Sequence, residues 1–294
     1  MKNSTHNKNI ASYFERNWKS LEKWCYANET LSIHYGYYDK TTKNLKDAVN
    51  KMNDIIGELL ELEENKSDNI LDAGCGVGGT SIYLAEKYPN AHFIGINISK
   101  VQVEQGKKFI KDRKIKNVTI LQEDYHKTTF PGNYFNSVFA IESAGYSEDI
   151  TEFITEMQRV LKPGGKLIVL DGFRTEVPMN CFLQNIYKKF LYARGYQTLD
   201  LPRLKTYLKL LEKKGFKKIN YTDISSRVAR SQIRGIIIAI PFFLSYLIKK
   251  IVTLGKYNKI TNYFDFSMGA SVFTPLLALG QVSRYYITTA YKTG

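Results

Sequence analysis

Short apolar runs alternate with amphipathic segments through the middle of the chain. The runs are rich in β-branched and aromatic residues, which favours buried strands, and the segments between them place apolar residues at helical spacing. Because strands that alternate with helices form parallel sheets, this pattern predicts a doubly wound α/β core with helices on both faces. The predicted strands are residues 69–73, 92–97, 117–122, 134–141 and 165–171, and the predicted helices are 79–88, 99–114 and 148–161.

The two ends of the chain depart from this alternation. Before the core, the spacing of apolar residues predicts helices at 10–30 and 45–62, separated by a tyrosine-rich loop. Two further strands after the core bring the predicted sheet to seven strands. The segments predicted after the core are helices at 178–193 and 201–214, a strand at 216–223, an apolar and basic stretch at 226–283, and a strand at 284–291.

The composition narrows the environment and the partners of the protein. Cys25, Cys75 and Cys181 are widely separated and suit neither a disulfide framework nor a zinc site. The polar start of the chain lacks an apolar signal region, so we expect a cytoplasmic protein, with membrane association as the alternative. A net charge of +14 could attract nucleic acid, but the lysines are scattered, and we expect no nucleic-acid partner.

The longest apolar run, residues 235–248, is followed by Lys249 and Lys250. It is shorter than the roughly 20 residues that cross a bilayer. We expect a buried or interfacial helix with a break at Pro241, because proline cannot donate the helical hydrogen bond. The favoured interpretation is a lining for an apolar pocket, and the alternative is shallow peripheral contact with a membrane.

The most informative segment is 69–80, in which a buried strand ends in Asp72 and a glycine-rich turn leads into a helix. Gly74 and Gly76 lie in that turn, where the lack of a Cβ lets the backbone approach a ligand closely. The start of the following helix adds N–H groups that have no partner within the helix. This arrangement predicts a nucleotide-like cofactor at the carboxyl end of the sheet.

The glycine spacing that starts at Gly74 also fits a dinucleotide site, which places an acidic residue at the end of the second strand. Here that strand ends in Asn97, and the acid stands before the glycines at Asp72. Together with the downstream run Arg159–Leu170, these features resemble the class I S-adenosylmethionine-dependent methyltransferases. NAD binding is the weaker alternative.

The resemblance implies a Rossmann-like, seven-stranded, mostly parallel sheet with helices on both faces, and S-adenosylmethionine as the cofactor. We divide the chain into an N-terminal helical lid over 1–66, the cofactor-binding core over 67–173, and a remainder over 174–294. The remainder completes the sheet with its two strands. Within it, 174–214 and 226–283 are interpreted as helical insertions that cap the substrate.

The resemblance also implies a cofactor site at the ends of the first three strands. Asp72 is expected to fix the glycine turn through N–H bonds and to orient the cationic methionine end of the cofactor. Asn97 and Gln102 are expected to face the ribose, and Asp124 the adenine amino group, whereas His126 is interpreted as a solvated loop residue. The full predicted set is Tyr35, Asp72, Gly74, Cys75, Gly76, Asn97, Ile98, Gln102, Asp124 and Tyr125.

Segments on the substrate side narrow the resemblance further. His34–Asp39, Gly95–Gln102 and Ile141–Asp149 are similar to the sterol and tocopherol C-methyltransferases, a group that includes bacterial natural-product methyltransferases. This group implies a lipophilic small-molecule acceptor, such as a sterol-like, prenyl or polyketide-like compound, that is methylated at carbon. In such a reaction aromatic faces stabilise positive charge and a base removes a proton.

Three residues of these segments are the catalytic candidates. Glu142 is the predicted base or substrate-holding acid. His34 is a candidate proton relay, with a structural loop histidine as the alternative. Tyr37 is a candidate cover for cofactor and substrate, with packing in the lid as the alternative.

Other functions stay open at this point. An O- or N-methyltransferase of secondary metabolism would share the fold, and so would an enzyme that keeps the cofactor without transferring its methyl group. A membrane-surface binding protein that uses the apolar run is a third class. The sequence also leaves open whether the protein forms a homo-oligomer, and no metal is expected.

Overall fold

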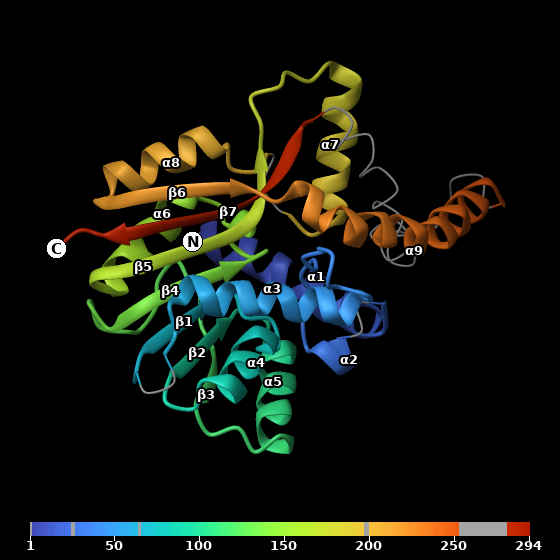
Figure 1. The fold of residues 1–294 in the computed structure, drawn as a ribbon. Coiled ribbons are helices and arrows are strands. Elements are labelled where there is room, and N and C mark those ends of the chain that lie inside the picture. Colours follow the sequence, from blue (N-terminus) through green and yellow to red (C-terminus); the bar gives the residue numbers. More distant parts are fainter. Residues whose placement is uncertain (1, 25–26, 64–65, 197–199, 253–280) are drawn as a thin grey trace.

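Seven strands form one sheet in the computed structural model, which describes residues 2–24, 27–63, 66–196, 200–252 and 281–294. Their order is β3-β2-β1-β4-β5-β7-β6 (Figure 1). The first five pair in parallel, whereas β7 runs antiparallel to β5 and β6, so the predicted mostly parallel sheet is confirmed. The strands are β1 (Asn69–Ala73), β2 (His92–Asn97), β3 (Val118–Gln122), β4 (Phe135–Ile141), β5 (Leu161–Arg174), β6 (Phe216–Asp223) and β7 (Ser283–Lys292).

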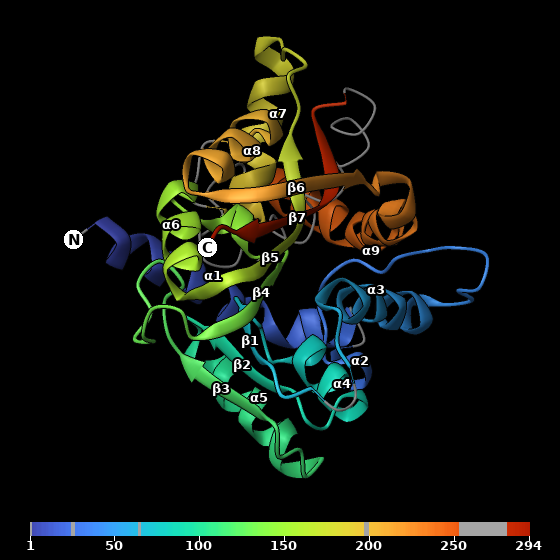
Figure 2. The same cartoon turned by 60° about the vertical axis from the view of Figure 1, so that its left-hand side comes forward.

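Helices cover both faces of this sheet, because its central strands present apolar side chains on both sides. Ile70 of β1 packs in one apolar layer and Leu71 in the other, and the same alternation separates Ile168 from Val169 on β5. The layer with Ile70 includes α3, α4 and α5, and the layer with Leu71 includes α6 and α8 (Figure 2). These helices are α3 (Leu45–Leu60), α4 (Gly79–Lys87), α5 (Lys100–Asp112), α6 (Ile150–Val160) and α8 (Leu204–Lys213).

The strand order reverses between β1 and β4. From β1 the chain builds outward through β2 to β3, then returns to place β4 on the other side of β1. In an open parallel sheet, such a reversal leaves a crevice beyond the carboxyl ends of the two strands, where connections diverge. The ends of β1 and β4, at Ala73 and Ile141, therefore mark the expected position of a ligand site.

The N-terminal helix begins earlier than the sequence pattern predicts. Helix α1 runs from Lys2 to Trp24 rather than from residue 10, and the short α2 (Ala27–Thr30) follows. Its first turns are too polar to be found by apolar spacing. They are nonetheless in contact with the body of the protein, since His6 is buried and its Nε2 lies 2.9 Å from the carbonyl oxygen of Tyr146. The early turns are therefore stabilised by tertiary contacts rather than by an amphipathic pattern.

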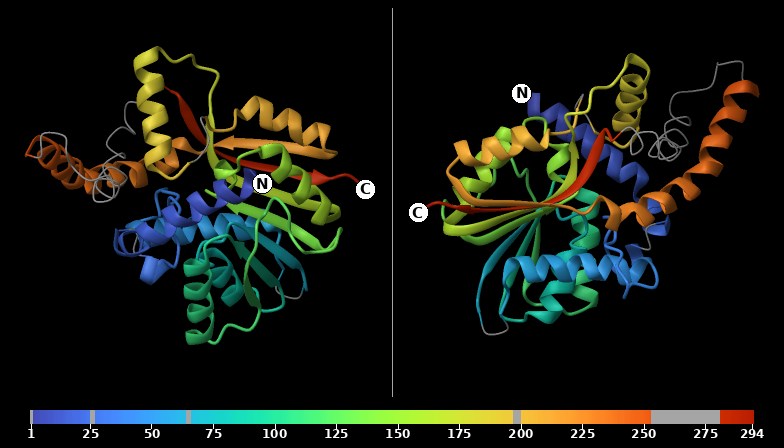
Figure 3. Two further views of the ribbon diagram at one scale, coloured as in Figure 1. Left: turned by 180° about the vertical axis from the view of Figure 1, so that it is seen from behind. Right: turned by 45° about the horizontal axis from the view of Figure 1, so that its top comes forward.

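After β5, some segments of the chain join the layers of the sheet and others lie outside them. Helix α8 packs beside α6 through Tyr207 and Leu211, so this end of the first predicted insertion lies in the helical layer of the sheet. Helix α7 (Cys181–Ala193) stands apart from that layer, and α9 (Ser225–Val252) runs away from the sheet (Figure 3). Residues 253–280, which complete the second predicted insertion, lie outside the described residues.

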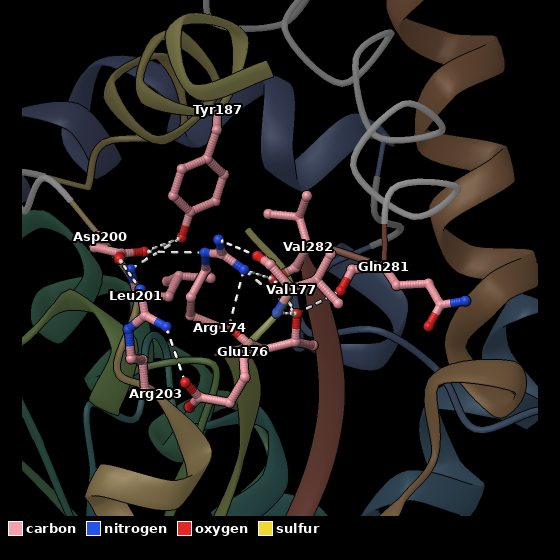
Figure 4. Close-up of polar contacts among 10 residues, drawn as sticks. Arg174, Glu176, Val177, Tyr187, Asp200, Leu201, Arg203, Gln281 and Val282 are labelled. Atoms are coloured by element: carbon pink, nitrogen blue, oxygen red, sulfur yellow. Dashed lines mark hydrogen bonds and ion pairs between the residues drawn. The ribbon is translucent and has the colours of Figure 1, made fainter. Parts of the chain in front are cut away.

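A buried arginine at the end of β5 ties these C-terminal segments together (Figure 4). Arg174 donates from Nη1 to the carbonyl oxygen of Val282 at 2.9 Å and from Nη2 to that of Val177 at 2.7 Å. Its Nε lies 3.7 Å from a carboxylate oxygen of Asp200, which also accepts a hydrogen bond from the Tyr187 hydroxyl at 2.9 Å. One buried cation thus fixes α7, the approach to α8 and the entry to β7 in a common position.

Helix α9 differs from its prediction. It continues through Pro241 without the expected break. Proline leaves the carbonyl of Ile237 without its helical donor, but Ile237 is 63% exposed, so water can take that bond. Among the described residues, Ser225–Ser245 is long and apolar enough to cross a membrane by length and composition alone. The apolar run 235–248 is short, as expected, but it belongs to a longer helix that starts before it. Its large side chains include Ile237 and Leu244, which are exposed, so the favoured interpretation of this run as a buried pocket lining is not supported.

Candidate active site

Two adjoining cavities open at the carboxyl ends of β1 and β4. The first is lined by the glycine turn, the ends of β2 and β3, and helix α1. The second, of about 350 Å³, lies among α7, the first turns of α9 and β7. Glu142, Tyr146 and Arg194 line both cavities and therefore mark their junction.

Close packing shapes the glycine turn after β1. The N–H groups of Gly74 and Cys75 both donate to the carbonyl oxygen of Ile96 on β2, at 2.9 and 3.0 Å. Gly74 has a φ of +89°, and a Cβ there would lie 2.4 Å from the Cβ of Ser143. Gly76 has a φ of +58°, and a Cβ there would meet nothing within 4 Å. Since Gly76 lines the first cavity, its backbone is open to a ligand there.

Asp72 is a buried carboxylate on the wall of the first cavity. It accepts a hydrogen bond from the Ser81 hydroxyl at 2.7 Å, whereas the turn N–H groups go to Ile96, which corrects the predicted role of Asp72 in fixing the turn. Burial raises the pKa of Asp72 to about 7, and the Ser81 bond opposes this rise. A positively charged ligand nearby would favour its ionised form.

Asn97 and Gln102 form the wall of the first cavity at the end of β2. The Asn97 amide nitrogen donates to the carbonyl oxygen of Gly76 at 2.9 Å and to Oε1 of Gln102 at 2.8 Å. Asn97 therefore braces the glycine turn. The Nε2 of Gln102 is buried and has no hydrogen-bond partner among the described residues, so its two N–H donors are available to a ligand in the cavity.

A polar network at the end of β3 joins the core to helix α1. Asp124 accepts hydrogen bonds from the Asn7 amide at 2.6 Å and from the backbone N–H of His126 at 2.9 Å. The His126 ring bridges Asp124 and Ser147, with 2.7 Å on each side, and its side chain is 4% exposed. His126 is thus a buried structural link, and its interpretation as a solvated loop residue was wrong.

His34 lines the first cavity, but both ring nitrogens face protein groups. Its Nδ1 lies 2.9 Å from the carbonyl oxygen of Tyr35, and its Nε2 lies 3.1 Å from the Asn53 side chain. Burial lowers the pKa of His34, and these two bonds only partly offset the effect, so the neutral ring is favoured. This geometry suits a histidine that holds the 33–35 loop.

Glu142 stands at the junction of the cavities in a strained backbone conformation, with a φ of +49°. Its Oε1 accepts hydrogen bonds from the N–H of Tyr35 at 2.6 Å and from the hydroxyl of Tyr285 at 3.0 Å. Its carboxyl group is enclosed by the protein where it lines the two cavities. This burial raises the pKa of Glu142 to about 7, against the effect of the Tyr35 bond and with a further rise from the charge of Asp171.

Asp171 provides a second carboxyl group in the second cavity. It accepts hydrogen bonds from the N–H groups of Gly145 and Gly172 at 2.8 and 2.7 Å. Burial raises the pKa of Asp171 to about 6, although both bonds oppose the rise. The second cavity therefore contains two carboxyl groups that can exchange protons near neutral pH.

Comparison with known proteins decides the family. The family described as "Methyltransferase domain" matches residues 64–220, more than half of the 294-residue chain. The chain belongs to this methyltransferase family. A probable chloroplastic tocopherol O-methyltransferase of Oryza sativa subsp. japonica is 30% identical over 210 residues, which cover 67% of this methyltransferase and 57% of that protein. A sterol 24-C-methyltransferase of Gibberella zeae is 28% identical over 158 residues, covering 53% of this chain and 41% of that one.

Solved structures agree with the Rossmann-like fold. Geranyl diphosphate methyltransferase in complex with geranyl diphosphate and sinefungin has a TM-score of 0.74 at 13% identity, covering 98% of this methyltransferase and 100% of that chain. The [4+2]-cyclase SpnF has a TM-score of 0.73 at 21% identity, covering 97% of this chain and 95% of that one. These structures confirm the predicted fold, and the family match confirms the methyltransferase predicted from the sequence, for which S-adenosylmethionine is the expected cofactor.

The first cavity of the methyltransferase fits this cofactor. The backbone of Gly76 is accessible to a ligand because no Cβ covers it, and the buried carboxyl group of Asp72 suits a cationic group. The side-chain nitrogen of Gln102 can donate a hydrogen bond to the cofactor. Every predicted cofactor residue except Tyr35 lines this cavity. The contacts that each would make with the cofactor stay predictions.

The three catalytic candidates and Tyr35 lie at different distances from the junction. Glu142 is at the junction, and His34 is in the wall of the first cavity. Tyr35 lines the second cavity and not the first. Tyr37 lines neither: its N–H bonds to the carbonyl oxygen of Ala48, and its ring lies 5.6 Å from the Arg227 guanidinium. The catalytic role of Tyr37 therefore stays a prediction without support from its position.

Several cavity residues were not expected from the sequence. Asn7, Tyr13 and Phe14 of α1 line the first cavity, and Arg194 lines both. No motif marks them, because each reaches the site through packing between segments far apart in the chain. The available signal was indirect: Arg194 precedes a glycine at the end of a predicted helix, where a cap fixes the preceding residue.

Proposed function

We propose that this methyltransferase transfers the methyl group of S-adenosylmethionine to a carbon atom of a lipophilic small molecule held in the second cavity. The observation that carries the proposal is the position of Glu142, a carboxyl group with a raised pKa at the junction where cofactor and acceptor cavities meet. The relatives named as sterol and tocopherol methyltransferases support a lipophilic acceptor.

The bound cofactor supplies an electrophilic methyl group on a sulfonium sulfur. The protein orients the acceptor and excludes water, which carries much of the catalysis in an in-line displacement. The aromatic side chains of the second cavity can stabilise positive charge that passes to the acceptor. Glu142 then accepts the proton that the methylated carbon must lose. The aromatic residues of the second cavity are Tyr35, Tyr146, Phe190, Tyr196 and Tyr285.

Two alternatives differ from this proposal in their products. An O- or N-methyltransferase would methylate a heteroatom, where no carbon-bound proton has to leave. An enzyme that keeps the cofactor without using it would release no S-adenosylhomocysteine, and the fold of SpnF, named as a cyclase, makes this outcome a necessary control.

The deciding experiment is an assay with methyl-labelled S-adenosylmethionine against a lipophilic extract, followed by mass spectrometry of labelled products. We expect S-adenosylhomocysteine and a product labelled on carbon. A label on oxygen or nitrogen would reject the carbon acceptor but retain the methyltransferase. Absence of S-adenosylhomocysteine with every fraction would reject methyl transfer.

Replacement of Tyr285 by phenylalanine tests how Glu142 is tuned. The Tyr285 hydroxyl stabilises the carboxylate of Glu142, so its removal is expected to raise the pKa of Glu142. The pH of half-maximal turnover should then move upward, measured as turnover against pH with saturating cofactor. Tyr221→Phe, on the exposed side of β6, is the matched control. If the pH profile of Tyr285→Phe matches that of the parent protein, the Tyr285 hydrogen bond does not affect the group that titrates during turnover.

We also propose that α9 makes peripheral contact with an anionic membrane surface. Helix α9 projects from the body of the protein (Figure 3). Exposed apolar residues recur along it at helical spacing, namely Ile233, Ile237, Ile240, Leu244 and Ile251. Such a stripe of large apolar residues marks an interaction surface. Its charge suits anionic lipid, because the first turns of α9 carry exposed arginines and the whole chain has a net charge of +14.

Co-sedimentation with vesicles of phosphatidylcholine and phosphatidylserine tests this contact. The parent protein should bind, and the double variant Ile240→Asp/Leu244→Asp should lose most of that binding, because buried apolar area drives it. Val101→Asp, an exposed apolar position on α5, is the control. Binding that survives the double variant would reject the stripe. A change from dimer to monomer in light scattering, without vesicle binding, would assign the stripe to self-association instead.

A further inference from the structure

The backbone of the tyrosine-rich loop, residues 34–39, is bonded to three separate parts of the protein. Four successive N–H groups, those of residues 35–38, donate to groups far away in the sequence. The acceptors are the side chain of Glu142, the carbonyl oxygen of Ala48 in α3, and two groups in the first turns of α9. A loop bonded in this way is fixed relative to all three. Its position therefore bears on Glu142, the proposed base.

The first turns of α9 accept two of these four bonds. The N–H of Gly36 donates to the Ser231 hydroxyl oxygen at 3.0 Å, and the N–H of Tyr38 donates to the carbonyl oxygen of Arg227 at 2.9 Å. The Arg230 guanidinium lies 4.6 Å from the centre of the Tyr38 ring, close enough for a cation–π contact. Backbone and side-chain contacts together thus join the loop to α9.

The peptide group between Tyr35 and Gly36 is held on both of its sides. Its carbonyl oxygen lies 2.9 Å from Nδ1 of His34, and its N–H is the one that donates to Ser231. Because a peptide group is planar, bonds to its oxygen and to its N–H fix its orientation. On the α3 side, a Cβ at Gly36 would lie 2.6 Å from that of Ala48, so the loop cannot move closer to this helix.

The N–H of Tyr35, one peptide group earlier, is the one that reaches Glu142. It donates to Oε1 at 2.6 Å, and the Tyr285 hydroxyl donates to the same oxygen at 3.0 Å. Within the part of the chain that the structure describes, Oε2 accepts no hydrogen bond. The two bonds therefore hold Oε1 and leave Oε2 as the oxygen that can take a proton from an acceptor.

The same turns of α9 also form a wall of the second cavity. Ser225, Ala229 and Gln232 line this cavity. Ser231 is buried and lies instead on the side of the helix that contacts the loop. One short stretch of helix thus contacts both the proposed acceptor site and the loop that holds the base. Since the helical hydrogen bonds keep such a stretch in one shape, it can fix the base relative to the acceptor.

We propose that Ser231 is a positioning residue for Glu142. By accepting the N–H of Gly36, it holds the preceding N–H of Tyr35 on Oε1, and this leaves Oε2 directed to the acceptor. The inference rests on the proposed function, because it takes Glu142 as the base. It extends that function by giving the tyrosine-rich loop and α9 a role in orienting the base.

An infrared titration tests this role without knowledge of the acceptor. The protein is saturated with S-adenosylhomocysteine, and the C=O stretch of protonated Glu142 is followed against pH as the band that Glu142→Gln lacks. The parent protein should titrate near pH 7, because burial raises the pKa of Glu142 to about 7. The Tyr35 bond lowers this pKa, so its weakening in Ser231→Ala should move the midpoint upward by roughly half a pH unit or more. Ser231→Thr, which keeps the hydroxyl group, should restore the parent midpoint.

A matched control separates this role from a structural one. Thr155→Ala also removes a hydroxyl group, but one that bonds to Thr151 within α6, and it should keep the parent midpoint. A merely structural Ser231 would lower the free energy of unfolding without moving the midpoint, so an unchanged midpoint in folded Ser231→Ala would overturn the inference. The other titratable and charged groups around Glu142 stay the same in all of these variants, namely Tyr35, Tyr146, Asp171, Arg194, Tyr196 and Tyr285.

A second variant decides the matter if Ser231→Ala does not fold. Arg230→Gln, at an exposed position, removes the contact with the Tyr38 ring and leaves the helix intact. Amide hydrogen exchange at Tyr35 and Gly36 should then be roughly threefold or more faster than in the parent protein. Exchange at the parent rates would show that α9 does not hold the loop. Neither measurement requires methyl transfer, so this inference and the proposed function can fail separately.

Discussion

Replacement of Glu142 by glutamine should reduce methyl-transfer turnover by roughly 100-fold or more, the range attributed to positioned acid–base groups. The glutamine amide keeps an oxygen that can accept from Tyr35 and Tyr285, so the loop and the cavity should retain their shape. Affinity for S-adenosylhomocysteine, measured by calorimetry, should therefore change by less than about threefold. The variant removes the capacity to take a proton and little else.

If Glu142 is the base, turnover should also rise with pH. A general base acts as the carboxylate, and burial raises the pKa of Glu142 to about 7. Turnover of the parent enzyme should therefore rise between about pH 6 and pH 8 with a midpoint near 7. The glutamine variant should lack this rise. Glu148→Gln, an exposed acid six residues along, is the control and should keep the parent profile.

Stability should change in the opposite direction to activity. A carboxyl group whose pKa is raised in the folded protein favours folding while protonated, and that contribution is lost as the pH rises through the folded pKa. At pH 8, Glu142→Gln should thus be more stable than the parent by roughly 1–3 kcal/mol, the scale of a pKa shift of this size. Chemical denaturation at pH 5 and pH 8 measures the effect. Equal loss of turnover and of cofactor affinity, with reduced stability, would indicate that Glu142 is structural.

The sheet and its cofactor edge could be predicted because their determinants are local. Alternation within Asn69–Ala73 places Ile70 and Leu71 on opposite faces whatever surrounds the strand. The glycine turn is equally local, since its positive φ angles exclude most other residues. The order of the strands was not predicted, because it depends on the connections between strands rather than on any single residue.

The missed features depend on contacts between distant parts of the chain. His126 reads as a loop histidine until Ser147 and Asp124 close around its ring. Helix α1 starts in a polar segment with hydrogen-bond partners more than 100 positions away, as for His6 and Tyr146. Pro241 signals a break by local rules, but an exposed helix can leave one carbonyl to water. Such positions carry no periodic signal, so only the folded chain reveals them.

Two alanine substitutions in the glycine turn should separate folding from cofactor binding. In Gly74→Ala the new Cβ would lie 2.4 Å from that of Ser143. Ser143 cannot retreat easily, because its hydroxyl bonds to Ala73 and its carbonyl oxygen accepts from the Tyr125 hydroxyl. We expect a loss of roughly 3 kcal/mol or more in the free energy of unfolding, combining backbone strain with overpacking.

Gly76→Ala should have a smaller effect on the free energy of unfolding and a larger effect on cofactor binding. Its Cβ would meet nothing within 4 Å, so the cost to folding is the left-handed backbone alone, about 1–2 kcal/mol. The new methyl group would, however, occupy space at the edge of the cofactor cavity, and affinity for S-adenosylhomocysteine should fall by roughly tenfold or more.

Gly164→Ala supplies the control, because Gly164 also has a positive φ and open surroundings but does not line the cavity. It should match the stability loss of Gly76→Ala while binding the cofactor product normally. If Gly76→Ala binds as tightly as Gly164→Ala, the cofactor does not approach the turn at Gly76, and the placement of its methionyl and ribose parts over this backbone is wrong.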